Sequence, residues 1–266
     1  MRLIGIDAGG SLIKIAYVER DILHVKTYPN LETEKLLQWL KSVAPEATLR
    51  VTGGKSGQLA TVATQKCRQI DEFQALVEGT RYLLDLEKHS PSAEYIVVNV
   101  GTGTSIFHVT PTSFERLSGS GVGGGTLMGL GSLITGEKDF LKLLELAAKG
   151  NHNNSDLLVK DIYAPDDAPI FGELTASNFG KANYNENANA ADHMAALMQL
   201  IGETLILLAG QAALAKNVKK IIFIGSTLDG NKTLQHVLTS FQDRIPYEPV
   251  FLSSGAYAGA IGALLL

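Results

Sequence analysis

The sequence predicts an α/β protein made of two similar halves, each with the element order β-β-β-α-β-α, around a central cleft. A glycine turn at residues 6–14 is repeated at residues 99–106, and each copy lies between two runs of strand-forming residues. In both halves three predicted strands precede the first helix, which excludes a simple alternating βαβ fold. With 266 residues and 45% hydrophobic content, the chain can bury a large core.

The first half is predicted to span residues 1–93. Apolar residues recur at helical spacing between residues 32 and 43, and Asp71 is suited to cap a second periodic segment. The predicted order is strands at 2–7, 12–19 and 21–28, a helix at 32–43, a strand at 48–52 followed by a helix, and a helix at 71–86.

The second half, residues 94–266, repeats this plan with an insertion at about 150–190. The insertion is polar and rich in asparagine, and we expect it to pack over the cleft or to make a subunit contact, with disorder as the alternative. The other predicted elements are strands at 94–100, 103–110 and 113–117, helices at 123–133 and 138–149, a long apolar helix at 190–216, strands at 220–224 and 247–252, and a helix of small residues at 255–266.

Two β-β-β-α-β-α halves match the duplicated actin-like ATPase fold, which is ribonuclease H-like. In this architecture two facing glycine turns hold the phosphates of a nucleotide. Glycine lets a phosphate approach the backbone N–H groups, and the hydroxyls of Ser11, Thr102 and Thr104 add donors. Asp7, at the end of its strand, could hold Mg²⁺ through water. A single glycine turn would favour an ordinary hairpin, but two copies in matching contexts favour a phosphate site.

Three further glycine segments are candidate phosphate or nucleotide sites. Residues 123–125 follow a strand and begin a helix, whose N–H groups attract phosphate. Residues 224–226 end a strand, where α/β folds bind ligands. Residues 53–56 read Gly-Gly-Lys-Ser, but Leu49 occupies the place of the first P-loop glycine, so this segment predicts a strand-to-helix turn.

Phosphoryl transfer to an alcohol needs a base and a cation. Glu72 is a candidate base, although an acidic residue at a helix start is also favoured by the helix dipole alone. Arg116 could pair with a substrate carboxylate or phosphate, and a surface arginine is the alternative.

Composition excludes several other classes of function. The net charge is −4 and no Lys/Arg-rich run exists, so we expect no nucleic-acid partner. The single cysteine, Cys67, excludes a disulfide framework or a cysteine-based zinc site and favours the cytoplasm. We also expect no signal peptide, because the N-terminal residues read as a strand without a charged segment and a long apolar segment. We expect no membrane contact, because the apolar stretch at 256–266 is too short to span a bilayer. The six histidines lack ligand spacing.

Taken in order, these segments resemble the type II pantothenate kinases, in particular the form found in staphylococci and bacilli. The resemblance covers nearly the whole chain and is most specific at 172–180 and around Glu72. The segments that carry it are 5–14, 49–54, 71–73, 99–105, 123–125, 172–180 and 255–263.

The resemblance implies ATP-dependent phosphorylation of pantothenate at its primary hydroxyl, the first step of coenzyme A biosynthesis, with ATP and Mg²⁺ as cofactors in a homodimer. It implies that Glu72 is the general base and that Glu72, Thr102 and Arg116 contact the substrate. The implied ATP-binding residues are Asp7, Ala8, Gly9, Gly10, Ser11, Leu12, Ile13, Lys14, Thr102, Gly124, Gly125, Thr126, Leu127, Met128, Phe140 and Ser226.

Two alternatives stay open at this point. A sugar kinase of the same superfamily is the closest enzyme alternative, but the bacterial sugar kinases with a similar first turn usually carry a cysteine-rich zinc motif. A non-catalytic nucleotide switch is the other, and it would need a polymer interface or a peptide-binding domain.

Overall fold

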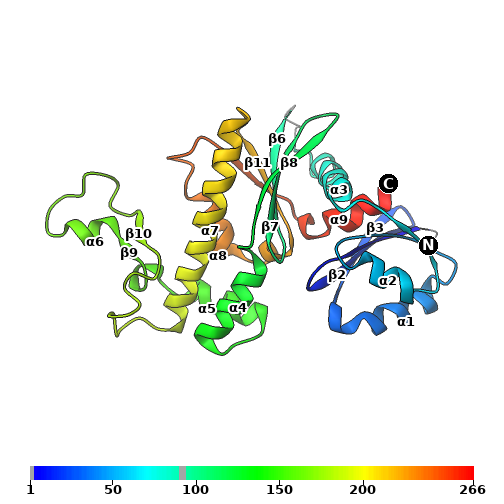
Figure 1. Ribbon diagram of the computed structural model, residues 1–266, viewed down its shortest axis with the longest axis horizontal. Coiled ribbons are helices and arrows are strands. Elements are labelled where there is room, and N and C mark those ends of the chain that lie inside the picture. Colours follow the sequence, from blue (N-terminus) through cyan, green and yellow to red (C-terminus); the bar gives the residue numbers. More distant parts are fainter. Residues whose placement is uncertain (1–2, 90–93) are drawn as a thin grey trace.

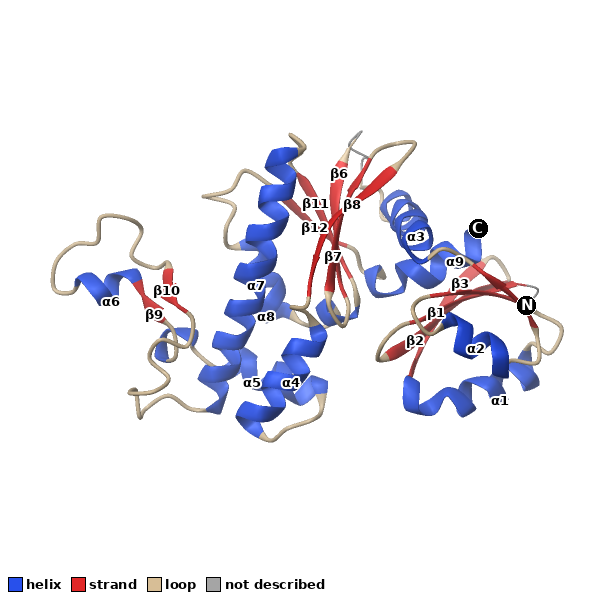
Figure 2. Ribbon diagram, viewed as in Figure 1, coloured by secondary structure: helices blue, strands red, loops and turns tan. Residues whose placement is uncertain are grey.

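The computed structural model describes residues 3–89 and 94–266, and it contains two five-stranded sheets (Figures 1 and 2). The first sheet has the order β3-β2-β1-β4-β5 and the second the order β8-β7-β6-β11-β12. The first comprises β1 (Leu3–Ala8), β2 (Leu12–Glu19), β3 (Ile22–Pro29), β4 (Thr48–Thr52) and β5 (Lys66–Gln69). The second comprises β6 (Tyr95–Val100), β7 (Thr104–Val109), β8 (Phe114–Ser120), β11 (Lys220–Ile224) and β12 (Glu248–Phe251).

The two sheets follow one plan. In each, the central strand pairs antiparallel with the next strand of the chain and parallel with the strand that follows the first crossover: β1 with β2 and β4, and β6 with β7 and β11. This equivalence confirms the predicted duplication. Both glycine turns join the first two strands of a half, so they occupy equivalent places in the two sheets.

Helices cover the sheets and lie between them (Figure 1). The first half contributes α1 (Thr33–Val43), α2 (Ser56–Val62) and α3 (Glu72–Leu86), and the second α4 (Gly124–Thr135), α5 (Phe140–Lys149), α7 (Ala190–Ala215), α8 (Lys232–Thr239) and α9 (Ala258–Leu265). Helix α9, at the end of the chain, packs against α3 and β1 of the first half.

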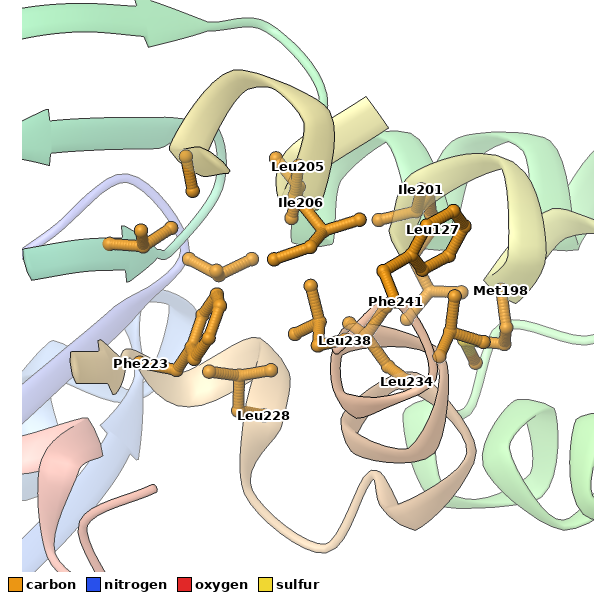
Figure 3. Packing of buried hydrophobic residues seen from close by; sticks show 14 of the residues in the cluster. Leu127, Met198, Ile201, Leu205, Ile206, Phe223, Leu228, Leu234, Leu238 and Phe241 are labelled. Atoms are coloured by element: carbon orange, nitrogen blue, oxygen red, sulfur yellow. The ribbon is translucent and has the colours of Figure 1, made fainter. Parts of the chain in front are cut away.

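The apolar core forms three clusters. One lies between the first sheet and helices α1 and α2. A second lies where α3 and α9 meet the second sheet. The largest surrounds α7, where α4, α8 and the second sheet converge; Figure 3 shows Leu127, Ile201, Phe223, Leu234 and Phe241 in it. By length and composition α7 could cross a membrane, but half of that apolar window is buried, as expected for a core helix.

The insertion differs from the expectation that it would cover the cleft. It is an ordered segment containing β9 (Leu157–Leu158), α6 (Val159–Tyr163) and β10 (Thr175–Ser177), and it extends from the far side of α7 (Figure 1). Thr175 and Asn178 donate hydrogen bonds to Glu203 on α7, at 2.7 and 3.0 Å. None of its residues lines the central cleft. A role in subunit contact stays a prediction.

Outside the insertion, whose three short elements were not predicted, one strand and one helix were also missed. Strand β5 is short, polar and at a sheet edge, so it lacks an apolar pattern. Helix α8 has eight residues and is capped by Asn231, whose side chain accepts a hydrogen bond from the Leu234 N–H. Residue 2 of the first predicted strand and residues 90–93 at the predicted boundary between the halves lie outside the described residues.

Candidate active site

A cleft of about 560 Å³ lies between the two glycine turns. Its walls come from both halves, and the turns meet directly: the hydroxyl oxygens of Ser11 and Thr102 are 3.3 Å apart. The predicted site residues that line the cleft are Asp7, Gly9, Gly10, Ser11, Leu12, Lys14, Glu72, Thr102, Arg116 and Ser226. The cleft therefore gathers both glycine turns, the candidate base and the candidate anchor.

The first turn is fixed by the backbone and by one side chain that the sequence reading did not single out. The Gly9 N–H donates to the Leu12 carbonyl at 3.0 Å. The Asn30 amide donates to the Gly9 and Gly10 carbonyls at 3.1 and 2.7 Å. These bonds hold the carbonyls of the turn in place.

The second turn is anchored by the start of α4. The N–H groups of Gly124 and Gly125 donate to the carbonyls of Gly101 and Thr102, both at 2.8 Å. Thr227 also donates to the Gly101 carbonyl, at 2.9 Å. The turn itself therefore uses two N–H groups of the helix start that is predicted to attract phosphate.

Gly124 and Gly125 instead line an apolar pocket that adjoins the cleft. It has a volume of about 220 Å³ and is lined on its apolar side by Met128 and Phe140. It shares Ser11, Thr102 and Ser226 with the cleft, so the two spaces are continuous. An aromatic ring at the end of a phosphate cleft suits a flat heterocyclic base.

Four predicted ATP-binding residues line neither the cleft nor the adjoining apolar pocket. Ala8, Ile13 and Leu127 are buried in the hydrophobic core. The Thr126 hydroxyl donates to the Gly121 carbonyl at 3.0 Å at the start of α4. These residues shape the walls behind the site.

Asp7 lies at the end of β1 with its side chain 17% exposed. Desolvation raises the pKa of its carboxyl, and the nearby Lys14 ammonium opposes that shift. The Lys14 Nζ lies 3.7 Å from Asp7 Oδ2. A Cβ at Gly53 would lie 2.6 Å from Asp7 Oδ1, and one at Gly259 would lie 2.9 Å from Oδ2. Glycines on both sides therefore make room for the carboxylate.

Glu72 is the first residue of α3. The Asp71 side chain caps this helix by accepting from the Gln74 N–H at 2.8 Å. Desolvation in the cleft raises the pKa of Glu72, and the negative charges of Asp7 and Asp71 raise it further, against a smaller opposing effect of Lys14. A carboxylate with a raised pKa at a cleft wall is suited to accept a proton.

Arg116, on β8, reaches the same cleft as Glu72. Its guanidinium lies over the Phe73 ring, 5.6 Å from the ring centroid, and Phe73 packs edge-on against the buried Phe107. A Cβ at Gly119 would overlap Arg116 Nη2. The aromatic platform and the bare glycine backbone thus set the position of the guanidinium.

Several cleft residues were missed as site residues by sequence reasoning, among them Thr52, Asn99, Gly255 and Gly259. Thr52 and Gly259 reach the cleft only because β4 and α9 pack beside β1. Both lie in segments that carry the family resemblance, 49–54 and 255–263, but the residue types in those segments do not by themselves place them at the cleft.

Comparisons with known proteins show the family and the fold of the chain. The family model named Fumble matches residues 21–266. A protein of Oceanobacillus iheyensis named type II pantothenate kinase is 46% identical over 265 residues, covering all of this chain and 99% of the relative. A protein of the same name from Bacillus cereus is 42% identical, covering 99% of this chain and 98% of its own.

Solved structures share the fold at low sequence identity. An activator of the 2-hydroxyisocaproyl-CoA dehydratase from Clostridium difficile, with bound ADPNP, superposes with a TM-score of 0.66 at 16% identity, covering 100% of this chain and 93% of that one. A ROK family glucokinase from Streptomyces griseus, with glucose and AMPPNP, gives 0.53 at 12% identity, with 98% and 97% covered. The chain therefore has the actin-like ATPase fold and belongs to the type II pantothenate kinase family.

Proposed function

We propose that this protein transfers the γ-phosphoryl group of ATP to the primary hydroxyl of pantothenate, giving 4′-phosphopantothenate, the first step of coenzyme A biosynthesis. The observation that carries this proposal is the meeting of Glu72 and Arg116 with both phosphate turns in one cleft. The curated relatives, named type II pantothenate kinases, support pantothenate as the acceptor.

The nucleotide occupies the cleft and the adjoining apolar pocket. Its phosphates lie between the turns, with the hydroxyls of Ser11 and Thr102 as donors and Lys14 as the nearby cation. The heterocyclic base of the nucleotide lies in the apolar pocket against Met128 and Phe140, beside Ser226. Gly124 and Gly125 form the wall of that pocket.

Asp7 is suited to hold Mg²⁺ through water. Its carboxylate is mostly buried, has room on both sides at Gly53 and Gly259, and faces the phosphate turns. Across residues 3–89 and 94–266, no cluster of three or more His, Cys, Asp or Glu side chains offers a fully protein-built cation site. One carboxylate with phosphate oxygens and waters is a set that Mg²⁺ accepts. When bound, the ion neutralises phosphate charge.

The transfer itself follows from the two cleft side chains. Arg116 pairs with the pantothenate carboxylate and so orients the hydroxyl, while Thr102 contacts the substrate beside the second turn. As the hydroxyl oxygen forms its bond to the γ-phosphorus in line, the bond from that phosphorus to the β,γ-bridging oxygen breaks and ADP leaves. Glu72 accepts the proton of the hydroxyl.

A coupled ADP-release assay with Mg-ATP tests this function. Pantothenate is the acceptor, with glucose, N-acetylglucosamine and no acceptor as controls, and the product is identified by mass. We expect ADP release that depends on pantothenate and a product heavier by one phosphoryl group. Release with a sugar alone would favour the sugar kinase, and equal release without acceptor would favour a nucleotide switch.

We further propose that the enzyme is a homodimer in the cytoplasm, without a nucleic-acid or membrane partner. Three leucines on α7, Leu207, Leu208 and Leu214, are between 39% and 54% exposed although this helix forms the centre of the largest core cluster. Leu207 and Leu214 are seven residues apart and share one helix face. This face is the proposed subunit contact.

A further inference from the structure

Thr52 stands out within the cleft because its hydroxyl has no partner. Its side chain is fully buried and lines the cleft. Among the residues that the structure describes, Thr52 Oγ1 is the one buried side-chain nitrogen or oxygen atom without a hydrogen bond. Such an atom destabilises the fold, so an orphan at a binding site suggests a partner that arrives in another state of the protein.

Strand register shows what lies beside this hydroxyl. Thr52 on β4 pairs with Asp7 on β1, and Asp7 pairs in turn with Lys14 on β2. Residues directly opposite each other on neighbouring strands project to the same face, roughly 5 Å apart. Lys14, Asp7 and Thr52 therefore form a row across three strands, with the carboxylate in the middle, and all three line the cleft.

In this row the carboxylate is paired on one side only. Asp7 Oδ2 lies 3.7 Å from the Lys14 ammonium, whereas Thr52 Oγ1 has no acceptor within hydrogen-bonding distance. A bound nucleotide brings several negative charges beside Lys14, which then has a stronger partner than Asp7. The carboxylate would then be left without a donor in a mostly buried place.

We infer that Thr52 is a positioning residue for Asp7: its hydroxyl donates a hydrogen bond to the Asp7 carboxylate when bound phosphates draw Lys14 away. The hydrogen bond holds the Asp7 carboxylate in position to bind the water ligands of the cation. The same bond gives the Thr52 hydroxyl an acceptor. This inference rests on the proposed role of Asp7 in holding the metal.

The test measures Mn²⁺ binding in the presence of AMPPNP by electron paramagnetic resonance, together with the Tm of the ligand-free enzyme. Thr52→Val removes the hydroxyl and keeps the shape of the side chain. We expect its Mn²⁺ affinity to fall about tenfold, the usual effect of one hydrogen bond to a charged group. We expect its ligand-free Tm to rise, because the orphan hydroxyl is gone.

Two variants separate the hydroxyl from packing. Thr52→Ser keeps the hydroxyl and should bind Mn²⁺ as the wild type does. Thr80 is equally buried in α3, but its hydroxyl donates to the Leu76 carbonyl at 2.7 Å, so Thr80→Val should lower the Tm and leave Mn²⁺ affinity unchanged.

Asp7→Asn distinguishes failure of this inference from failure of the proposed function. If Asp7→Asn weakens Mn²⁺ binding and Thr52→Val does not, the inference is wrong and the role of Asp7 stands. If neither variant weakens binding, the metal role of Asp7 itself is wrong. A lower Tm for Thr52→Val, or weak binding by Thr52→Ser, would also overturn the inference.

Discussion

The pKa of Glu72 is raised because of its position at the start of α3, where the cleft walls desolvate the carboxylate and Asp7 and Asp71 add negative charge. We expect Glu72→Gln to lower kcat by about 10²- to 10⁴-fold, the usual contribution of a general base. ATP affinity should be kept, because no phosphate contact is assigned to this side chain. Steady-state kinetics and calorimetric titration with AMPPNP measure the two quantities, and a near-normal kcat would remove Glu72 from this role.

The pH dependence of the reaction follows from the same side chain. Its pKa is raised above the ordinary glutamate value of 4.5, so the base form is lost at a higher pH than usual. We expect kcat to fall as the pH decreases through that raised pKa, with the acid limb above pH 4.5. The contribution of Glu72 to the free energy of unfolding changes with pH in the opposite direction. Because its pKa is raised in the folded state, protonated Glu72 stabilises the fold below the ordinary pKa, and this stabilisation is lost as the pH rises through the raised pKa. A kcat that stays flat down to pH 4.5 would contradict the assignment.

Gly119 tests the position of the arginine without removing it. A Cβ there would overlap Arg116 Nη2, so Gly119→Ala should push the guanidinium off the Phe73 ring. We expect the KM for pantothenate to rise about tenfold or more, since a misplaced arginine loses a charge-assisted hydrogen bond, while the KM for ATP changes little. Gly54→Ala is the control, because a Cβ at Gly54 meets nothing within 4 Å. An unchanged pantothenate KM would argue against Arg116 as the anchor.

At the scale of elements, α9 joins the two halves through contacts that only glycine permits. A Cβ at Gly79 on α3 would overlap the Ala258 carbonyl oxygen, and a Cβ at Gly262 on α9 would overlap the Ala75 carbonyl oxygen. The helices therefore meet backbone to backbone. We expect Gly262→Ala to lower the free energy of unfolding in urea by about 2–3 kcal/mol, the usual effect of overpacking.

Gly129→Ala is the matched control for the helix crossing. Gly129 lies in α4, where a Cβ meets nothing within 4 Å, so alanine should add about 0.5–1 kcal/mol through its better helix propensity. If Gly262→Ala unfolds like the wild type, the helices can separate without loss and the crossing does not hold the halves together.

The element scale also shows which predictions the sequence supports. The paired glycine turns and the strand triplets are local patterns, so the repeated strand order was predicted correctly. The small-residue helix at 255–266 was predicted as an element, but its docking on α3 and β1 depends on contacts with residues about 180 positions or more away along the chain. Strand β5 was missed for a different reason: a polar edge strand lacks the alternating apolar residues from which a strand is predicted.

At the scale of the whole molecule, the site residues come from separate parts of the chain. Asp7 and Glu72 are contributed by the first half, and Thr102 and Arg116 by the second. The sequence predicted these residues from glycine turns and from family resemblance, and the structure brings them to one cleft. Thr52 and Asn30 were missed because each acts through the neighbours that the fold gives it. The division of the chain at residue 93 stays a prediction.

The proposed homodimer gives the last prediction. Leu207 and Leu214 are exposed on one face of α7, and the chain has a mass of 28.4 kDa. We expect the wild type to show twice this mass by light scattering at micromolar concentration, and Leu207→Glu with Leu214→Glu to show 28.4 kDa, because four buried carboxylates would oppose association. Leu133→Glu, at an 82% exposed leucine on α4, is the control and should remain dimeric. Wild type at 28.4 kDa would exclude the homodimer, and a glutamate variant that stays dimeric would move the contact to another face.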